Sequence, residues 1–203
     1  MSYLFMFDLI GCGVFALSGA IIAYQKKMDG IGVIVLGAVT AIGGGTVRDL
    51  LLDVPVFWVT QPSYIYAIIC SSLIAILWIN SSKKLPEKSL EIADALGLAL
   101  FVVMGTAKAL GTGVPPLIAV IMGTITGCFG GMIRDVLANE IPLIFRKELY
   151  AACCIAGGSA YVLLTPYISD TLSASIAFTI ILLLRLMAIK WQLALQVFTY
   201  KNK

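Results

Sequence analysis

Long apolar runs alternate with short polar connections along the whole chain. Seven such runs can be drawn, and each is close to the ~20 residues that a helix needs to cross the hydrocarbon core of a bilayer. Backbone groups inside that core must be satisfied within the segment, so the runs predict helices. A membrane barrel would show short alternating strands, and these runs do not alternate. The predicted spans are Leu4–Tyr24, Ile31–Leu52, Ser63–Ile79, Ile92–Leu110, Pro116–Ala138, Leu149–Pro166 and Leu172–Ile189.

The composition agrees with a membrane protein. The chain is 60% hydrophobic and 12% charged, with a mean hydropathy of +1.00, whereas a soluble domain has about 45–50% apolar and about 25% charged residues. The first run has the length of a signal peptide, but no basic region precedes it and a similar segment recurs in mid-chain. We therefore expect it to be the first helix of an all-α polytopic membrane protein.

The basic residues predict how the spans are oriented. Lysine or arginine follows the first, third, fifth and seventh spans, while the connections at 53–62, 111–115 and 167–171 contain neither. By the positive-inside rule, the N-terminus lies outside and the C-terminus in the cytoplasm. The net charge is +3, and the basic residues form no stripe for nucleic acid, so no nucleic-acid partner is expected.

The two halves of the chain repeat one another at a constant offset. The pair Arg48-Asp49 recurs as Arg134-Asp135, which lies 134 − 48 = 86 positions later, and several glycines and aromatic residues match at the same offset. Each copy holds three spans, and an odd number reverses the second copy, so the pattern predicts inverted repeats. We expect a first three-helix repeat over 1–86, a second, inverted repeat over 87–171, and a seventh helix with a cytoplasmic tail over 172–203.

Glycine clusters lie inside the second and fifth predicted spans, at Gly43, Gly44 and Gly45 and at Gly130 and Gly131. Glycine weakens a helix, and a broken helix in a membrane can line a water-filled cavity with freed carbonyls that coordinate a cation. We expect such a break in both spans. The alternative is close helix packing through small residues.

Charged residues inside spans are costly and are functional hypotheses by default. Arg48 and Asp49 end the second span, and Arg134 and Asp135 occupy the same place in the fifth. Each pair could line a pore, or it could lock a helix end, with the arginine reaching the interface. The two roles stay open at this point.

Four further charged positions have ordinary structural explanations. Lys108 stands where the first copy has Ile22, and it either reaches the interface or controls a pathway. Asp8 and Asp94 stand near the starts of their spans, where a carboxylate complements the helix dipole, so we expect capping. Arg185 in the last span is expected to reach the cytoplasmic interface.

No catalytic or metal-binding set is visible in the sequence. There is no histidine, and none of the five cysteines forms a CxxC pair. The glycine triplet is followed by Thr46, Val47 and Arg48 rather than by the Gly-Lys-Ser/Thr of a phosphate-binding loop. We therefore expect neither an enzyme nor a cofactor.

These motifs closely resemble those of the prokaryotic TRIC family, the trimeric intracellular cation channels, whose bacterial members also carry a glycine transporter label. The resemblance covers nearly the whole chain. It rests on the following residues: GGGTVRD at 43–49, Pro55, Phe57-Trp58, GCFGGMIRDV at 127–136, Asn139-Glu140-Ile141-Pro142 and Glu148-Leu149-Tyr150-Ala151.

The resemblance implies a homotrimer in a bacterial inner membrane, with a pore for K⁺ and Na⁺ through each protomer between kinked second and fifth helices. The kinks would map onto Gly43–Gly45 and Gly130–Gly131, and Lys108 would match a lysine linked to gating in animal relatives. Those relatives carry a Lys-Glu-Val motif in place of the glycine stretch, so their lipid dependence is not transferred.

Three functions therefore compete. The first is a passive cation channel in which Thr46, Asp49, Asp135 and freed carbonyls provide selectivity. The second is a secondary transporter for a small solute such as glycine, because inverted repeats occur in transporters too. The third, a structural membrane protein, predicts a dry interior around Gly44 and Gly130.

Overall fold

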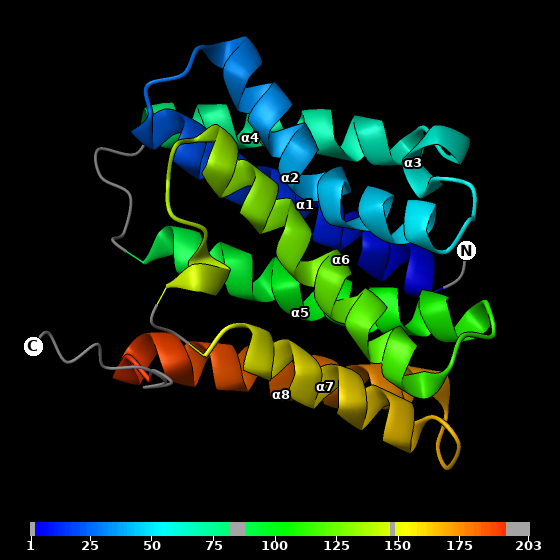
Figure 1. The fold of residues 1–203 in the computed structure, drawn as a ribbon. Helices are drawn as coiled ribbons and strands as arrows, with labels where there is room; N and C mark the ends of the chain where they lie inside the picture. The colour runs from blue at the N-terminus through cyan, green and yellow to red at the C-terminus, as the bar shows by residue number, and fades with distance from the viewer. Residues whose placement is uncertain (1–2, 82–87, 147–148, 194–203) are drawn as a thin grey trace, which may run out of the picture.

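The computed structural model describes residues 3–81, 88–146 and 149–193, and within these ranges every regular element is a helix. Figure 1 shows long helices that run side by side and reverse direction at each connection. The elements are α1 (Tyr3–Gln25), α2 (Gly30–Leu51), α3 (Phe57–Thr60), α4 (Ser63–Ser81), α5 (Ser89–Gly111), α6 (Pro116–Leu137), the 3₁₀ turn η1 (Leu143–Phe145), α7 (Ala151–Leu164) and α8 (Asp170–Trp191).

Each predicted span overlaps one of the helices α1, α2, α4, α5, α6, α7 and α8, and α3 and η1 lie in the connections. Five described helices are long and apolar enough to cross a bilayer, namely α1, α2, α5, α6 and α8. The apolar parts of α4 and α7, Ser63–Trp78 and Ala151–Leu164, are shorter. The all-helical membrane class is therefore confirmed. The count of seven spans stays a prediction because a 14-residue helix such as α7 is short of the ~20 residues of a full crossing.

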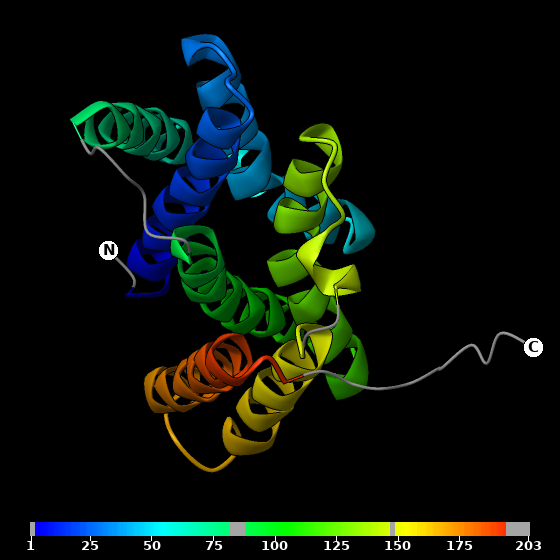
Figure 2. The same ribbon diagram turned by 90° about the vertical axis from the view of Figure 1, so that its left-hand side faces the viewer.

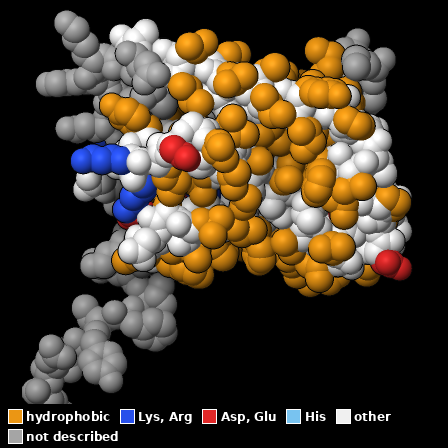
Figure 3. All heavy atoms as spheres, turned by 90° about the horizontal axis from the view of Figure 1, so that it is seen from above, with side chains coloured by type: hydrophobic (Ala, Val, Ile, Leu, Met, Phe, Trp, Pro, Cys, Tyr) orange, Lys and Arg blue, Asp and Glu red, His pale blue; other side chains and the backbone are white. Residues whose placement is uncertain are grey.

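The helices pack around α5. Seen end-on in Figure 2, α1 and α5 lie in the middle, α4 lies outside α1, and the α7–α8 pair covers the other side of α5. One apolar core joins α5 to α6, α7 and α8, and a second joins α1, α2, α4 and α5. Figure 3 shows an apolar surface across the molecule, with Lys and Arg side chains at one end. This surface fits a chain whose middle lies in lipid.

The glycines of α2 and α6 do not break their helices. Both helices run without interruption through the glycine clusters. A Cβ at Gly44 would overlap the carbonyl oxygen of Thr126, and a Cβ at Gly130 would overlap that of Thr40. The expectation of a helix break with freed carbonyls is therefore wrong for this structure. The glycines instead let two backbones touch where α2 crosses α6, which is the small-residue packing named as the alternative.

Contacts at this crossing are exchanged between the two copies. At the offset of 86, Gly44 corresponds to Gly130 and Thr40 corresponds to Thr126. The contact of Gly44 with Thr126 therefore reappears as the contact of Gly130 with Thr40. Other contacts are duplicated within each copy. The hydroxyl of Tyr64 donates to Asp8 at 2.8 Å, and that of Tyr150 donates to Asp94 at 2.7 Å. Swapped and duplicated contacts are what a two-fold relation between the copies would produce.

The crossing predicts how α2 responds to a single added methyl group. Gly44→Ala should destabilise the protein by about 1–3 kcal/mol, because the methyl group forces the two backbones apart. Gly111→Ala is the matched control, since a Cβ there meets nothing within 4 Å. Thermal unfolding in detergent measures both variants. Equal tolerance of the two substitutions would contradict the packing role.

Candidate functional site: two buried arginine–aspartate networks

The first network closes the end of α2. Arg48 and Asp49 are 2% and 0% exposed, and Arg48 Nε donates to Asp49 Oδ1 at 2.8 Å. The other carboxylate oxygen of Asp49 accepts from the backbone N–H of Phe57 at 3.0 Å. Phe57 begins the short helix α3, so Asp49 ties the end of α2 to the chain that follows it. Arg48 and Asp49 are adjacent on the helix, and they pair through one carboxylate oxygen.

Lys108 joins this network from α5. Its Nζ lies 2.8 Å from Asp49 Oδ1 and 2.9 Å from Oδ2. The Lys108 side chain is 35% exposed, unlike the residues it meets. The ring of Phe57 lies under both cations, with its centroid 5.8 Å from Arg48 Cζ and 5.9 Å from Lys108 Nζ. Lys108 therefore binds the network rather than only reaching for the interface.

The second network closes the end of α6 with the same core. Arg134 Nε donates to Asp135 Oδ1 at 2.8 Å, and Asp135 Oδ2 accepts from the backbone N–H of Leu143 at 3.0 Å. Leu143 begins η1, which takes the place of α3. Arg134 and Asp135 are 0% and 1% exposed. Each Asp therefore holds its own Arg on one oxygen and the start of the following turn on the other.

Beyond this shared core the second network has different hydrogen-bond and ion-pair partners. Arg134 Nη1 donates to Ser18 Oγ on α1 at 2.8 Å and to Asp94 Oδ1 on α5 at 2.9 Å. The other oxygen of Asp94 accepts from Tyr150. All of these groups are buried. Asp94 is thus an ion-pair partner in the interior, and the expectation that it caps α5 is wrong because its carboxylate binds the side chains of Arg134 and Tyr150.

Residue types that differ at positions related by the offset of 86 explain why the two networks have different partners. Ser18 corresponds to Met104, which offers no hydrogen-bond acceptor of similar strength, and Leu143 corresponds to the aromatic Phe57. Asp8, the counterpart of Asp94, accepts from Tyr64 and has no ion pair in the described part of the chain. Asp8 is therefore not a cap for α1 either. The first network recruits Lys108 from the other copy instead.

The chain is similar to known membrane proteins over nearly its whole length. A family model described as "Glycine transporter" matches the chain twice, at residues 5–80 and 91–166. The UPF0126 inner membrane protein YadS of Escherichia coli (strain K12) is 45% identical over 196 residues, which are 94% of each chain. A solved TRIC trimeric intracellular cation channel orthologue from Rhodobacter sphaeroides is 37% identical and covers 95% of this chain and 100% of its own, with a TM-score of 0.90. The chain belongs to the prokaryotic TRIC family.

A further TRIC structure, reported for its conductance, is 33% identical, covers both chains completely and has a TM-score of 0.87. The two stretches matched by the family model start 91 − 5 = 86 positions apart, the same offset that relates the two networks. The TRIC relatives with solved structures are channels rather than enzymes.

Thr46 lies one turn before the first network of this TRIC chain. Its Oγ1 donates to the carbonyl of Ile42 at 2.7 Å and accepts from Trp58 Nε1 at 2.9 Å. Trp58 is the second residue of α3, and its hydrogen bond to Thr46 fastens α3 to α2. The sequence singled out Thr46 as a candidate for selectivity, but it did not indicate that the Trp58 indole donates to the Thr46 oxygen.

Sequence reasoning missed three members of the networks, Ser18, Phe57 and Tyr150. Tyr150 was detectable because Tyr64 matches it in the repeat. Ser18 matches Met104, a residue of a different type, so nothing in the repeat marked it. Arg185 was expected at the interface, but it is buried, with Nη1 3.2 Å from the carbonyl of Leu149 and Cζ 4.6 Å from the Tyr150 ring centroid.

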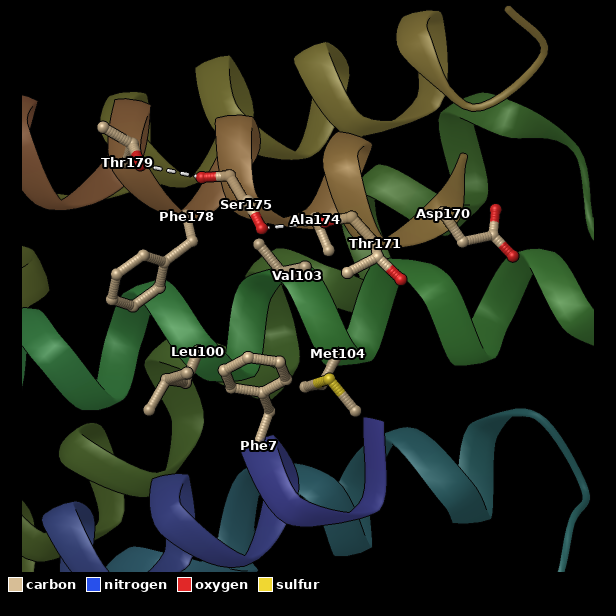
Figure 4. Close-up of a pocket in the computed structure, with 10 residues that line it drawn as sticks. All are labelled: Phe7, Leu100, Val103, Met104, Asp170, Thr171, Ala174, Ser175, Phe178 and Thr179. Carbon is tan, nitrogen blue, oxygen red and sulfur yellow. Dashed lines mark hydrogen bonds between the residues drawn. The ribbon is translucent and has the colours of Figure 1, made fainter. Parts of the chain in front are cut away.

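An apolar groove lies away from both networks. Figure 4 shows this groove of about 330 Å³ between α1, α5 and α8, lined by residues such as Phe7, Met104 and Phe178. None of the predicted site residues borders it. The described residues include no group of three or more His, Cys, Asp or Glu side chains that could hold a metal ion.

An ion pair outside the spans joins the two copies. Lys26, after α1, lies 2.7 Å from Glu140, after α6, and Arg146 lies 3.4 Å from the same carboxylate. The hydrogen bond and charge of Lys26 lower the pKa of Glu140. The pair is exposed to solvent, so it orients the loops more than it stabilises the fold.

The different partners of Asp94 and Asp8 predict that matched substitutions of the two residues change stability unequally. Asp94→Asn should cost about 3–5 kcal/mol, because it leaves the buried Arg134 without one of its charged partners. Asp8→Asn should cost clearly less, since Asp8 lacks such a pair. Thermal stability of the purified variants in detergent gives the comparison. A larger loss for Asp8→Asn would show that the ion pair to Arg134 is not the stronger constraint.

Proposed function

We propose that this protein is a channel for the monovalent cations K⁺ and Na⁺, with a pathway inside each protomer between α2 and α6. The observation that carries the proposal is the likeness over nearly the whole chain to solved TRIC cation channels. The two charge networks support it, since they stand at the ends of the two helices that cross in the middle of the molecule.

The proposed architecture is seven transmembrane helices in two inverted repeats, 1–86 and 87–171, followed by a separate helix and tail over 172–203. The swapped contacts of Gly44 and Gly130 support the inversion. The N-terminus would lie outside and the C-terminus in the cytoplasm. In support, Lys26, Lys88, Arg146 and Lys190 follow or precede helix ends that lie on one side of the molecule in Figure 1.

We assign the inner-membrane location and the homotrimer from relatives. YadS is named an inner membrane protein, and the Rhodobacter sphaeroides orthologue is described as trimeric. Each protomer would then hold its own pathway, because the side chains of one protomer complete both networks.

Beside this pathway the two arginines have a structural role, because they keep the surrounding helices in place. Arg48 and Arg134 are buried and bound to adjacent aspartates, and their charge would repel a passing cation if it were exposed. Asp49 and Thr46 are the groups that a cation would meet at the outer end, and Asp135 is its counterpart at the inner end. Of the glycines, Gly43, Gly44 and Gly130 allow the two helices to approach and so set the width between them.

The present arrangement corresponds to a closed channel. The α2–α6 crossing is packed backbone against backbone at Gly44 and Gly130, and the amine of Lys108 occupies the carboxylate of Asp49. A cation that enters from the outer end must displace the Lys108 amine, or the amine must move away first. Lys108 is the member of the network best able to move, since its long side chain is one-third exposed.

A transporter for a small solute such as glycine is the alternative. The description of the matching family model favours it, and inverted repeats are common among transporters. A channel and a transporter differ in how flux depends on concentration. A transporter saturates because each cycle carries a bound solute, whereas channel flux rises with the gradient.

The test uses purified protein in liposomes, with K⁺, Na⁺ and glycine fluxes measured side by side. We expect cation flux that does not saturate and no glycine uptake above empty liposomes. Asp49→Asn should lower the cation flux, because it removes a negative charge that attracts cations at the outer end. Saturable glycine uptake driven by an ion gradient would overturn the channel proposal.

The role of Lys108 is tested by removing its charge. Lys108→Gln should raise K⁺ flux by about three- to tenfold, because the ion pair that it breaks is partly exposed and is worth on the order of 1 kcal/mol. Lys190→Gln is the matched control, since Lys190 lies at the opposite end of the molecule near Trp191. Unchanged flux in a folded Lys108→Gln protein would show that Lys108 does not obstruct the pathway.

A further inference from the structure

One amino group of Arg134 is left without an acceptor. Nε and Nη1 bind Asp135, Asp94 and Ser18. Nη2 is completely buried, and among the described residues nothing accepts a hydrogen bond from it. A guanidinium carries five N–H groups, two of them on Nη2. Buried polar groups in proteins that lack a protein partner are usually satisfied by an ordered water molecule.

The surroundings of Gly131 fit such a water. A Cβ at Gly131 would have three polar atoms as its nearest neighbours. They are Asp94 Oδ1 at 3.1 Å, Arg134 Nη2 at 3.5 Å and the Tyr150 hydroxyl at 3.6 Å. These atoms come from α5, from α6 and from the residue before α7. Three convergent polar groups beside a residue without a side chain form a small polar cradle inside an otherwise apolar bundle.

The matching glycine in the first copy has a different environment. Gly45 corresponds to Gly131, and a Cβ there would meet carbon atoms of the Phe57 ring at 2.6, 3.2 and 3.3 Å. The aromatic ring fills the space that polar atoms border in the second copy. The two glycines therefore serve different purposes, although the repeat relates them.

We propose that the space left by the missing side chain of Gly131 holds one water molecule, bound by Arg134, Asp94 and Tyr150. Such a water accepts from Arg134 Nη2 and donates to Asp94 Oδ1 and to the Tyr150 oxygen, which gives the three hydrogen bonds typical of buried water. A cation is disfavoured there by the guanidinium, and an anion is disfavoured by Asp94 and Asp135. Gly131 is thus a positioning residue that fixes Arg134 through bound water, and its function is not to bend α6.

The test compares alanine and serine at this position. Alanine forms helices better than glycine and serine, so helix propensity alone favours Gly131→Ala over Gly131→Ser. If alanine displaces the water, the apparent melting temperature should fall by about 3 °C or more. The serine hydroxyl can replace the water on Arg134 and Asp94, so Gly131→Ser should recover at least half of that fall.

The same pair of substitutions at Gly45 is the control. Phe57 offers no hydrogen bond there, so Gly45→Ser should be no more stable than Gly45→Ala. A structure at a resolution that shows ordered water should have one within hydrogen-bond distance of Arg134 Nη2. A Gly131→Ser protein no more stable than Gly131→Ala, or a well-ordered Arg134 without that water, would overturn the proposal. Both readouts are independent of ion flux.

Discussion

A charged group removed from water must be paired, and this constraint organises both ends of the molecule. Arg48 and Arg134 are buried inside an apolar bundle, where an unpaired guanidinium would be far too costly. Each is held by the aspartate beside it, and that aspartate also receives the backbone N–H of the next short turn. One carboxylate therefore fixes an arginine and the exit of the chain from its helix together.

The crossing of α2 and α6 depends on this anchoring. Glycine at positions 44 and 130 lets the backbones touch, but small-residue contacts in a membrane gain no hydrophobic driving force against lipid. The networks beyond the crossing tie α2 to α5, and α6 to α1 and α5, through ion pairs and hydrogen bonds. Close packing in the middle and charge pairing at the ends thus hold the same two helices.

Duplication supplied the common core of the networks, and divergence gave their ends different properties. At the first network an exposed lysine completes the carboxylate, and an aromatic ring lies beneath the cations. At the second, Ser18, Asp94 and Tyr150 complete a set of buried partners. An exposed amine on a flexible stem exchanges partners with little cost, whereas a fully buried set cannot. The first network can therefore rearrange more easily than the second.

The sequence by itself determined the membrane class, the helices and the repeat. Those features depend on hydropathy over ~20 residues and on residue matches at one offset, which are local or periodic signals. The Arg-Asp pairs were found in the same way, since charges are conspicuous within apolar runs. Tertiary structure decided what each of these residues contacts. Ser18 and Arg134 are 116 positions apart, and no local pattern encodes such a meeting. The glycines are the clearest example. Weak helix propensity suggested a break, but contact between two helices favours a continuous helix with no side chain at the crossing, and that contact exists only in the folded bundle.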